Sequence, residues 1–91
     1  MKNKIKIIFI GSVLFSKYML DTLQQIKFIE IVAVITKKRK KIKSDYYDLG
    51  LSAKKYDLKT YYINDINSKH SLNILRKANA DYIFCLGWSQ L

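Results

Sequence analysis

The stretch KIKIIFIGS, residues 4–12, decides the fold that this sequence encodes. It begins with lysines between isoleucines, is continuously apolar over residues 7–10, and ends at Gly11-Ser12. A β-branched and aromatic run without polar interruption predicts a strand, and the Gly-Ser pair that follows predicts a turn. Strands that are apolar on both faces are typical of parallel sheets covered by helices on both sides.

The segment after this turn has helical periodicity. Apolar residues in 13–27 recur at steps of three and four: Phe15, Met19, Leu23 and Ile26, with Tyr18 alongside. Such spacing places them on one face of a helix, and Ser12 is a candidate N-cap. We therefore expect a helix that packs this face against the sheet.

Strand and helix patterns continue to alternate along the chain. Residues 28–36 and 82–86 are apolar enough for buried strands, and 59–63 fits a short strand. A short helix, weakened by Gly50, should start after Ser44 or Asp45 and share one apolar face: Tyr46, Leu49, Ala53 and Tyr56. A third helix, capped by Asn67 or Ser68, should likewise group Leu72, Leu75 and Ala78.

This strict alternation predicts parallel pairing through right-handed crossovers. We expect an α/β fold, a three-layer Rossmann-like parallel sheet of four strands in the order 3-2-1-4 with three helices. The topological switch point then falls between the first and fourth strands, and ligands should lie over their carboxyl ends. Those ends are residues 11–16 and 87–91.

The fourth strand is apolar on both faces, yet few residues follow it. A bare apolar strand with an open edge is an aggregation hazard in a finished domain. We therefore expect residues 1–91 to be the N-terminal half of a larger domain, truncated at Leu91, and the sheet to be incomplete.

The chain is strongly basic, with 17 Lys and Arg against 7 Asp and Glu and a net charge of +10. This excess fits an anionic partner, and it equally fits the lysine-rich usage of an AT-rich genome. Residues 37–43 concentrate six cations, either as a solvated loop or as a surface that attracts phosphate. The run lacks interleaved aromatic residues and any nucleic-acid-binding module, which argues against a dedicated nucleic-acid binder.

A single cysteine, Cys85, excludes an internal disulfide and favours a cytoplasmic protein. No His or Cys spacing fits a metal, so we expect no metal site. The basic and apolar N-terminus mimics a signal peptide but lacks a small-residue cleavage site, and the later apolar run 31–35 is too short for a bilayer. We expect no membrane segment, a surface position for His70 and a buried position for Cys85.

The turn after the first strand lacks the second and third glycines of a dinucleotide fingerprint. It either presents backbone N–H groups to an anion or simply turns the chain. At the other predicted strand end, Trp88, Ser89 and Gln90 suit a flat heteroaromatic ligand, although Trp88 could equally be packing. No paired carboxylates, Ser/His/Asp set or general base converge here, so we assign no catalytic residue.

Four segments together resemble the N-terminal part of the folate-dependent formyltransferase family: IIFIGSVLFSKYMLDTL (7–23), IVAVITKK (31–38), SDYYDL (44–49) and DYIFCLGWSQL (81–91). The first two are shared across the family, including methionyl-tRNA and glycinamide ribonucleotide formyltransferases. The SDYYDL and WSQL forms are more similar to bacterial enzymes that formylate an amino sugar on a nucleotide.

The resemblance implies transfer of a formyl group from 10-formyltetrahydrofolate to a primary amine. The pterin pocket would be lined by a segment at the end of the fourth strand: Gly87, Trp88, Ser89, Gln90 and Leu91. The acceptor substrate would lie beside a loop after the first strand, with candidate residues Gly11, Ser12, Phe15 and Ser16. Family catalysis uses an Asn, a His and an Asp later in the fold; none maps onto this chain, and His70 is on the wrong helix.

The expected function is therefore that of a formyltransferase fragment that is inactive alone and needs the C-terminal part of the same enzyme. Its small-molecule substrate would be an amino-sugar nucleotide. A methionyl-tRNA formyltransferase-like fragment and a small basic module that binds anions or another protein remain the alternatives.

Overall fold

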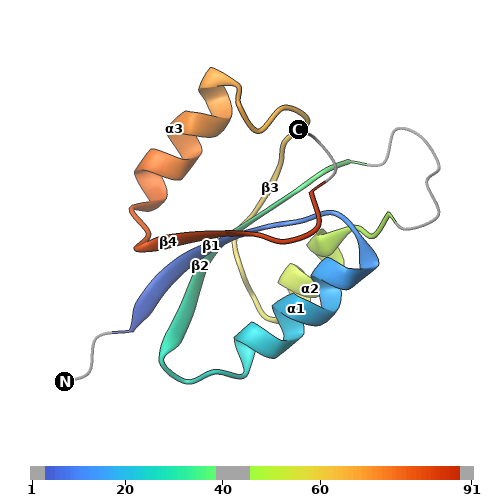
Figure 1. The fold of residues 1–91 in the computed structure, drawn as a ribbon, viewed down its shortest axis with the longest axis vertical. Coiled ribbons are helices and arrows are strands. Elements are labelled where there is room, and N and C mark those ends of the chain that lie inside the picture. Colours follow the sequence, from blue (N-terminus) through green and yellow to red (C-terminus); the bar gives the residue numbers. More distant parts are fainter. Residues whose placement is uncertain (1–3, 39–45, 89–91) are drawn as a thin grey trace.

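The computed structural model describes residues 4–38 and 46–88 (Figure 1). Strands and helices alternate along them, as the sequence predicts. The elements are β1 (Ile5–Ile10), α1 (Leu14–Gln24), β2 (Ile29–Thr36), α2 (Leu49–Lys55), β3 (Thr60–Tyr62), α3 (Lys69–Ala78) and β4 (Tyr82–Cys85).

The four strands form one sheet in the order β3-β2-β1-β4, and all neighbouring strands are parallel. This confirms the α/β, Rossmann-like sheet with order 3-2-1-4. Ile10 at the end of β1 is paired with Ile35 of β2 and with Cys85 of β4, and Thr36 is paired with Tyr62 of β3. The carboxyl ends of all four strands therefore lie at the same end of the sheet, which we call its carboxyl end.

Helices cover both faces of the sheet, with α1 and α2 on one side and α3 on the other (Figure 1). Alternate residues of β1 point to opposite faces, as a strand requires. The cluster under α1 and α2 contains Ile7, Phe9, Leu20, Leu23, Ile31, Val34, Leu49 and Ala53. The cluster under α3 contains Ile8, Ile10, Ala33, Ile35, Ile63 and Ile74.

Helix α1 confirms part of the apolar face that its spacing predicts, since Leu23 is buried and Met19 and Ile26 pack against the same cluster. Phe15 and Tyr18 are instead each 56% exposed, and Ser16 and Leu20 are buried in their place. The N-cap is Val13 and not Ser12. A long-range hydrogen bond explains why Ser16 faces inward. The Ser16 hydroxyl donates to the carbonyl of Leu86 at 2.6 Å and so holds Ser16 against the sheet.

Helix α2 starts later than predicted, because Asp48 is its N-cap. The Asp48 carboxylate accepts a hydrogen bond from the Gly50 N–H at 2.8 Å. Tyr46 therefore precedes the helix, and it forms an isolated bridge with Val13. The predicted caps Ser44 and Asp45 lie outside the described residues.

Helix α3 confirms Ser68 as an N-cap, since its hydroxyl accepts from the Ser71 N–H at 3.1 Å. Its phase differs from the prediction. Ile74 is buried and Leu75 and Ala78 pack beside it, but Leu72 is exposed, because the helix turns Ser71 and Ile74 toward β1 and β2.

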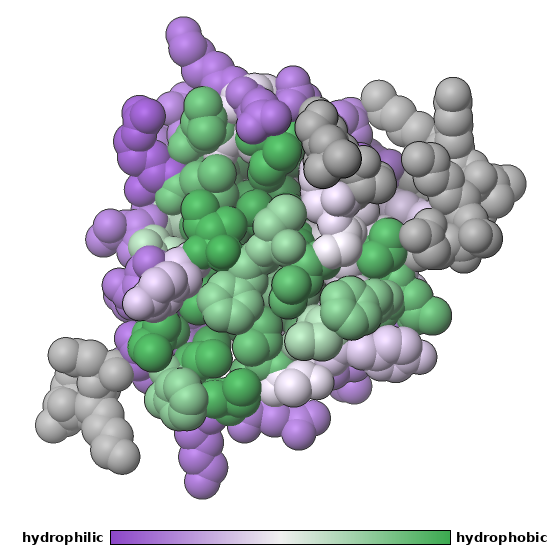
Figure 2. All heavy atoms as spheres, in the orientation of Figure 1, coloured by the Kyte–Doolittle hydropathy of each residue, from purple (hydrophilic) through white to green (hydrophobic). Residues whose placement is uncertain are grey.

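Strand β4 lies at an edge of the sheet, where much of its surface is open to solvent. Tyr82 is 60% and Ile83 52% exposed. Figure 2 shows hydrophobic side chains gathered across the middle of the face that carries β4.

Cys85 is exposed, which corrects the expectation that it is buried: the helices cover β1 and β2 and leave β4 partly bare. His70 is exposed, as expected.

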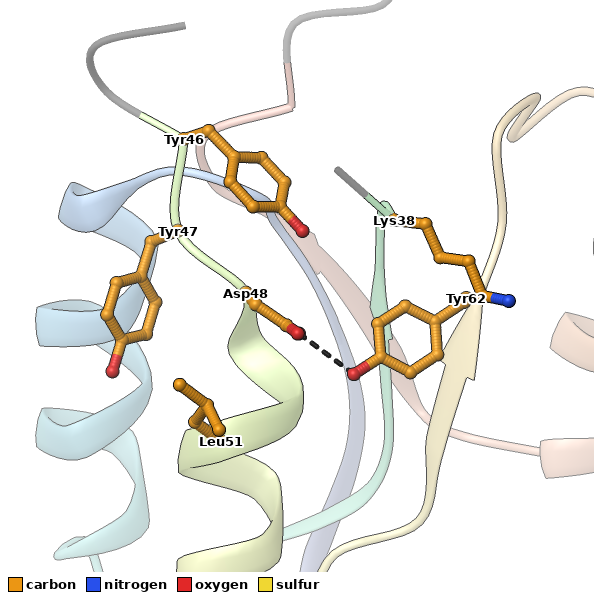
Figure 3. A pocket seen from close by; sticks show the side chains of 6 residues that line it. All are labelled: Lys38, Tyr46, Tyr47, Asp48, Leu51 and Tyr62. Carbon is orange, nitrogen blue, oxygen red and sulfur yellow. Dashed lines mark hydrogen bonds between the residues drawn. The ribbon is translucent and has the colours of Figure 1, made fainter. Parts of the chain in front are cut away.

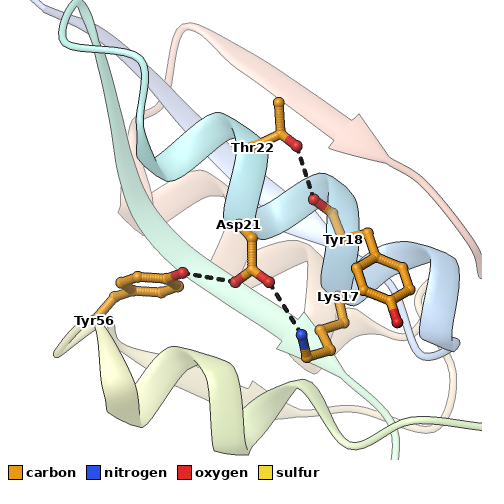
Figure 4. Close-up of polar contacts among 5 residues, drawn as sticks. All are labelled: Lys17, Tyr18, Asp21, Thr22 and Tyr56. Carbon is orange, nitrogen blue, oxygen red and sulfur yellow. Dashed lines mark hydrogen bonds and ion pairs between the residues drawn. The ribbon is translucent and has the colours of Figure 1, made fainter.

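A polar network ties α1 to α2 (Figure 4). The Tyr56 hydroxyl donates to Asp21 Oδ1 at 2.7 Å, and Lys17 Nζ lies 3.1 Å from Asp21 Oδ2. The hydrogen bond from Tyr56, with a further one from Lys17, lowers the pKa of Asp21 below its ordinary value of 3.8. The ionised carboxylate therefore stabilises the fold above that value, and this contribution is lost as the pH falls through the lowered pKa.

Replacing Tyr56 with Phe tests this network. We expect Tyr56→Phe to lower the free energy of unfolding by about 1 kcal/mol at pH 7, because one hydrogen bond to a carboxylate is removed. The difference from wild type should narrow as the pH falls below 3.8 and through the lowered pKa of Asp21, where the carboxylate becomes protonated. Urea unfolding at pH 7 and pH 3 measures both effects. Tyr18→Phe, an exposed phenol on α1, is the matched control; an equal loss there would contradict the assignment.

Candidate ligand-binding site

The loops after β1 and β4 meet at the predicted switch point. The Leu86 N–H donates to the carbonyl of Ile10 at 2.9 Å, and the Ser12 N–H donates to the carbonyl of Gly87 at 3.0 Å. The Ser16 hydroxyl adds the 2.6 Å bond to the Leu86 carbonyl. The structure therefore brings Ser12 and Ser16 together with Gly87, about seventy residues away in sequence, as parallel pairing of β1 with β4 requires.

Two glycines allow this close approach. A Cβ on Gly11 would lie 2.5 Å from the Leu86 carbonyl oxygen and 2.5 Å from Ser16 Oγ. Gly87 has φ +86°, a left-handed conformation that favours glycine, and a Cβ there would collide with Ser16 and Val13. The loop that we name the β1–β4 junction, residues 11–16 with 86–88, therefore depends on glycine at both strands.

The turn after β1 uses its N–H groups within the protein. The Gly11 N–H donates to the Ile35 carbonyl at 3.0 Å, and the Val13 N–H donates to Ser16 Oγ at 3.3 Å. The Ser12 N–H donates to the Gly87 carbonyl, as described above. The backbone N–H groups of Gly11, Ser12 and Val13 therefore all have partners within the protein, and none is left to bind an anion. Of the two interpretations of this turn, the structure favours the one in which it simply redirects the chain.

The candidate acceptor residues differ in accessibility. Gly11, Ser12 and Ser16 are buried, and the polar groups of Ser12 and Ser16 bond to the β4 loop. Phe15 is more than half exposed on the outer side of α1. Of these four residues, only Phe15 presents its side chain to solvent.

Trp88 is the last residue of the junction and is half-buried. Its side chain packs against the cluster under α3, and the Lys37 ammonium lies 4.7 Å from the centroid of the indole ring. This cation–π contact places one positive charge beside an aromatic ring, next to the carboxyl ends of β1 and β2. The other predicted pterin-pocket residues, Ser89, Gln90 and Leu91, lie outside the described residues.

Of the basic run 37–43, the structure describes Lys37 and Lys38. Both follow β2, at the same carboxyl end of the sheet as Trp88. The remaining cations of the run fall outside the described residues.

A second feature at the carboxyl end of the sheet was not predicted from the sequence. An open hollow of about 690 Å³, which we call the tyrosine hollow, lies near the carboxyl ends of β2 and β3 (Figure 3). It is lined by Lys38, Tyr46, Tyr47, Asp48, Leu51 and Tyr62. The adjacent tyrosines and aspartate of the SDYYDL segment were the signal that could have revealed it.

Hydrogen bonds position the polar groups of the tyrosine hollow. The Tyr46 hydroxyl donates to the Lys37 carbonyl at 2.6 Å, and the Tyr62 hydroxyl donates to Asp48 Oδ1 at 2.9 Å. Desolvation and the bond to Asp48 raise the pKa of Tyr62 to about 12. The phenol therefore stays protonated near neutral pH and keeps the carboxylate of Asp48 oriented.

Neither a metal cluster nor a membrane helix is found in the part of the chain that the structure describes. No group of three His, Cys, Asp or Glu side chains lies close enough together there to hold a metal ion. No helix there is long and apolar enough to span a bilayer. The sequence of the chain matches no protein-family model and no curated protein.

Proposed function

We propose that the chain is the N-terminal half of the catalytic domain of a cytoplasmic, folate-dependent formyltransferase, and that it carries one wall of the 10-formyltetrahydrofolate pocket. The observation that carries the proposal is the β1–β4 junction, which places Trp88 directly beyond a topological switch point. Ligands of open parallel sheets bind at this position. The resemblance of residues 81–91 to the pterin-lining segment of the family supports the same ligand.

The chemistry near Trp88 agrees with a folate. Its indole offers a flat surface to a pterin ring, and the Lys37 ammonium beside it attracts the carboxylates of the folate tail. The bare edge of β4 also agrees with the proposal, because further strands of the same enzyme would cover Tyr82 and Ile83.

The acceptor in this proposal is a primary amine, and an amino sugar on a nucleotide fits the SDYYDL and WSQL motifs best. In the family an Asn, a His and an Asp polarise the formyl carbonyl, stabilise the tetrahedral oxyanion and manage the amine proton. Since none of the three maps onto this chain, the 91 residues bind part of the donor and supply no catalytic group.

Binding of 5-formyltetrahydrofolate, a stable analogue of the donor, tests the proposal. Calorimetry on the full chain should detect binding, and Trp88→Ala should weaken it at least tenfold because the aromatic wall is lost. Phe28→Ala removes an exposed aromatic residue near the opposite end of the sheet and serves as the control. Equal binding by wild type and Trp88→Ala would overturn the proposed pocket.

An activity assay with 10-formyltetrahydrofolate and amino-sugar nucleotides tests the second half of the proposal. The chain alone should give no turnover. Turnover by these 91 residues would show that the catalytic groups have been wrongly placed outside them. Retention on heparin that is lost when the lysines of 37–43 are replaced, with no folate binding, would instead favour a basic anion-binding module.

A further inference from the structure

The tyrosine hollow combines three kinds of chemistry on residues that the proposed folate site does not use. No residue of the β1–β4 junction is among those that line it. Its volume of about 690 Å³ falls within the range of small-molecule sites, about 300–1,000 Å³. Among the residues that the structure describes, aromatic rings, one carboxylate and one ammonium line this space, so the occupant must satisfy all three.

Asp48 is the most specific of these groups. Its Oδ1 accepts from both the Gly50 N–H and the Tyr62 hydroxyl, at 2.8 and 2.9 Å. No described residue donates to Oδ2. A carboxylate that is held rigidly through one oxygen presents the other as a strong, oriented acceptor, and the ligand groups that such an oxygen binds are hydroxyls or N–H groups.

The surrounding side chains narrow the ligand further. Figure 3 shows the side chains of Tyr46, Asp48 and Tyr62 directed into the same space between α2 and the strand ends. Tyrosine rings pack against the C–H face of a sugar or against a flat base, and Lys38, which is exposed, supplies a positive charge for a phosphate. Inorganic phosphate alone would be repelled by Asp48, and an apolar ring alone would leave Oδ2 without a donor.

We propose that the tyrosine hollow binds a phosphorylated sugar ring, with the carboxylate of Asp48 accepting from sugar hydroxyls, the tyrosines packing on the ring and Lys38 pairing with the phosphate. A free sugar phosphate and a nucleotide share this chemistry. The inference rests on the proposed function for its occupant, because the amino-sugar nucleotide proposed above as acceptor carries this chemistry. It does not depend on folate binding, because it is argued from residues of α2, β3 and the segments beside them.

Titration of the ¹⁵N-labelled full chain tests the site. Glucose 6-phosphate and uridine 5′-monophosphate are the two probes, and glucose and inorganic phosphate are the comparisons. At least one probe should bind with a dissociation constant on the order of 1 mM or tighter, with amide shifts centred on residues 46–51 and 62. The probe that binds more tightly shows whether the site prefers a free sugar phosphate or a nucleotide. Shifts confined to other residues, or inorganic phosphate binding as tightly as both probes, would overturn the proposal.

The variant Asp48→Asn isolates the role of the carboxylate. Asparagine is an equally good N-cap, and its Oδ1 can keep the bonds from Gly50 and Tyr62, so the fold should be retained. The open oxygen becomes an NH₂ donor without charge, and binding of the preferred probe should weaken at least tenfold. Asp57→Asn is the matched control: Asp57 lies beyond the other end of α2, at φ 58°, which asparagine tolerates. Unchanged affinity in Asp48→Asn with a normal amide spectrum would refute the assignment.

The two proposals fail separately. The sugar-phosphate titration contains no folate, and the folate titration contains no sugar phosphate. Loss of the first with retention of the second leaves the folate pocket standing and removes the acceptor site placed in the tyrosine hollow, and the reverse result leaves a sugar-phosphate-binding domain of another kind.

Discussion

Gly11→Ala is expected to destabilise the protein by about 3 kcal/mol, at the upper end of the cost of overpacking a well-packed site. The added methyl group would lie 2.5 Å from both the Leu86 carbonyl oxygen and Ser16 Oγ. The carbonyl belongs to the backbone just beyond β4, so it can move only if the β1–β4 junction opens. Opening would also break the 2.6 Å bond from Ser16 to Leu86. Urea unfolding followed by far-ultraviolet circular dichroism measures the loss.

Gly50→Ala is the control for this substitution. The methyl group there would meet the hydroxyl end of the Tyr62 side chain, which can rotate away, and alanine gains about 1 kcal/mol of helix propensity over glycine. The two effects oppose each other, so the net change should stay within about 1 kcal/mol. If Gly11→Ala were as stable as Gly50→Ala, the two loops would not be packed as closely as described.

Leu20→Ala is expected to lower the free energy of unfolding by about 3 kcal/mol, within the range of about 2–5 kcal/mol for Leu→Ala in a core. Leu20 is fully buried between α1 and the sheet, in the cluster that contains Phe9 and Val34. Truncation removes apolar contacts and leaves a cavity that rigid neighbours fill incompletely. Chemical denaturation of the variant and wild type provides the measurement.

Phe15→Ala separates the observed phase of α1 from the one predicted from spacing. Phe15 is 56% exposed, so its truncation should change stability by no more than about 0.5 kcal/mol. If Phe15 were buried, as its spacing predicts, Phe15→Ala would lower the stability more than Leu20→Ala does, because phenylalanine is the larger side chain. A greater loss in Phe15→Ala than in Leu20→Ala would contradict the structure.

These two helix positions show where local patterns are ambiguous. Residues 14–24 contain apolar side chains at several possible faces, among them Phe15, Met19 and Leu20. Spacing alone prefers Phe15, because it is large and in register with Met19 and Leu23. The hydrogen bond that holds Ser16 inward joins residues 70 positions apart, and no local pattern contains it.

The candidate site shows a similar division. That the ends of β1 and β4 meet was predicted, because alternating strands and helices favour a doubly wound sheet in which the first and fourth strands are neighbours. The tyrosine hollow was not, because it depends on where α2 begins. Asp48 caps that helix and reaches Tyr62 on β3, and this contact requires the folded sheet.

The amino-acid sequence by itself determined the order of the elements along the chain, because continuous apolar runs and turn residues are properties of neighbouring positions. The alternation of strands and helices favoured the parallel sheet, and the predicted strand order 3-2-1-4 was confirmed by the tertiary structure. Only the tertiary structure decided the phases of α1 and α3, the exposure of Cys85 and the position of Asp48 beside Tyr62. Each of these depends on contacts between residues distant in sequence, and their free energy exceeds the small differences among local alternatives.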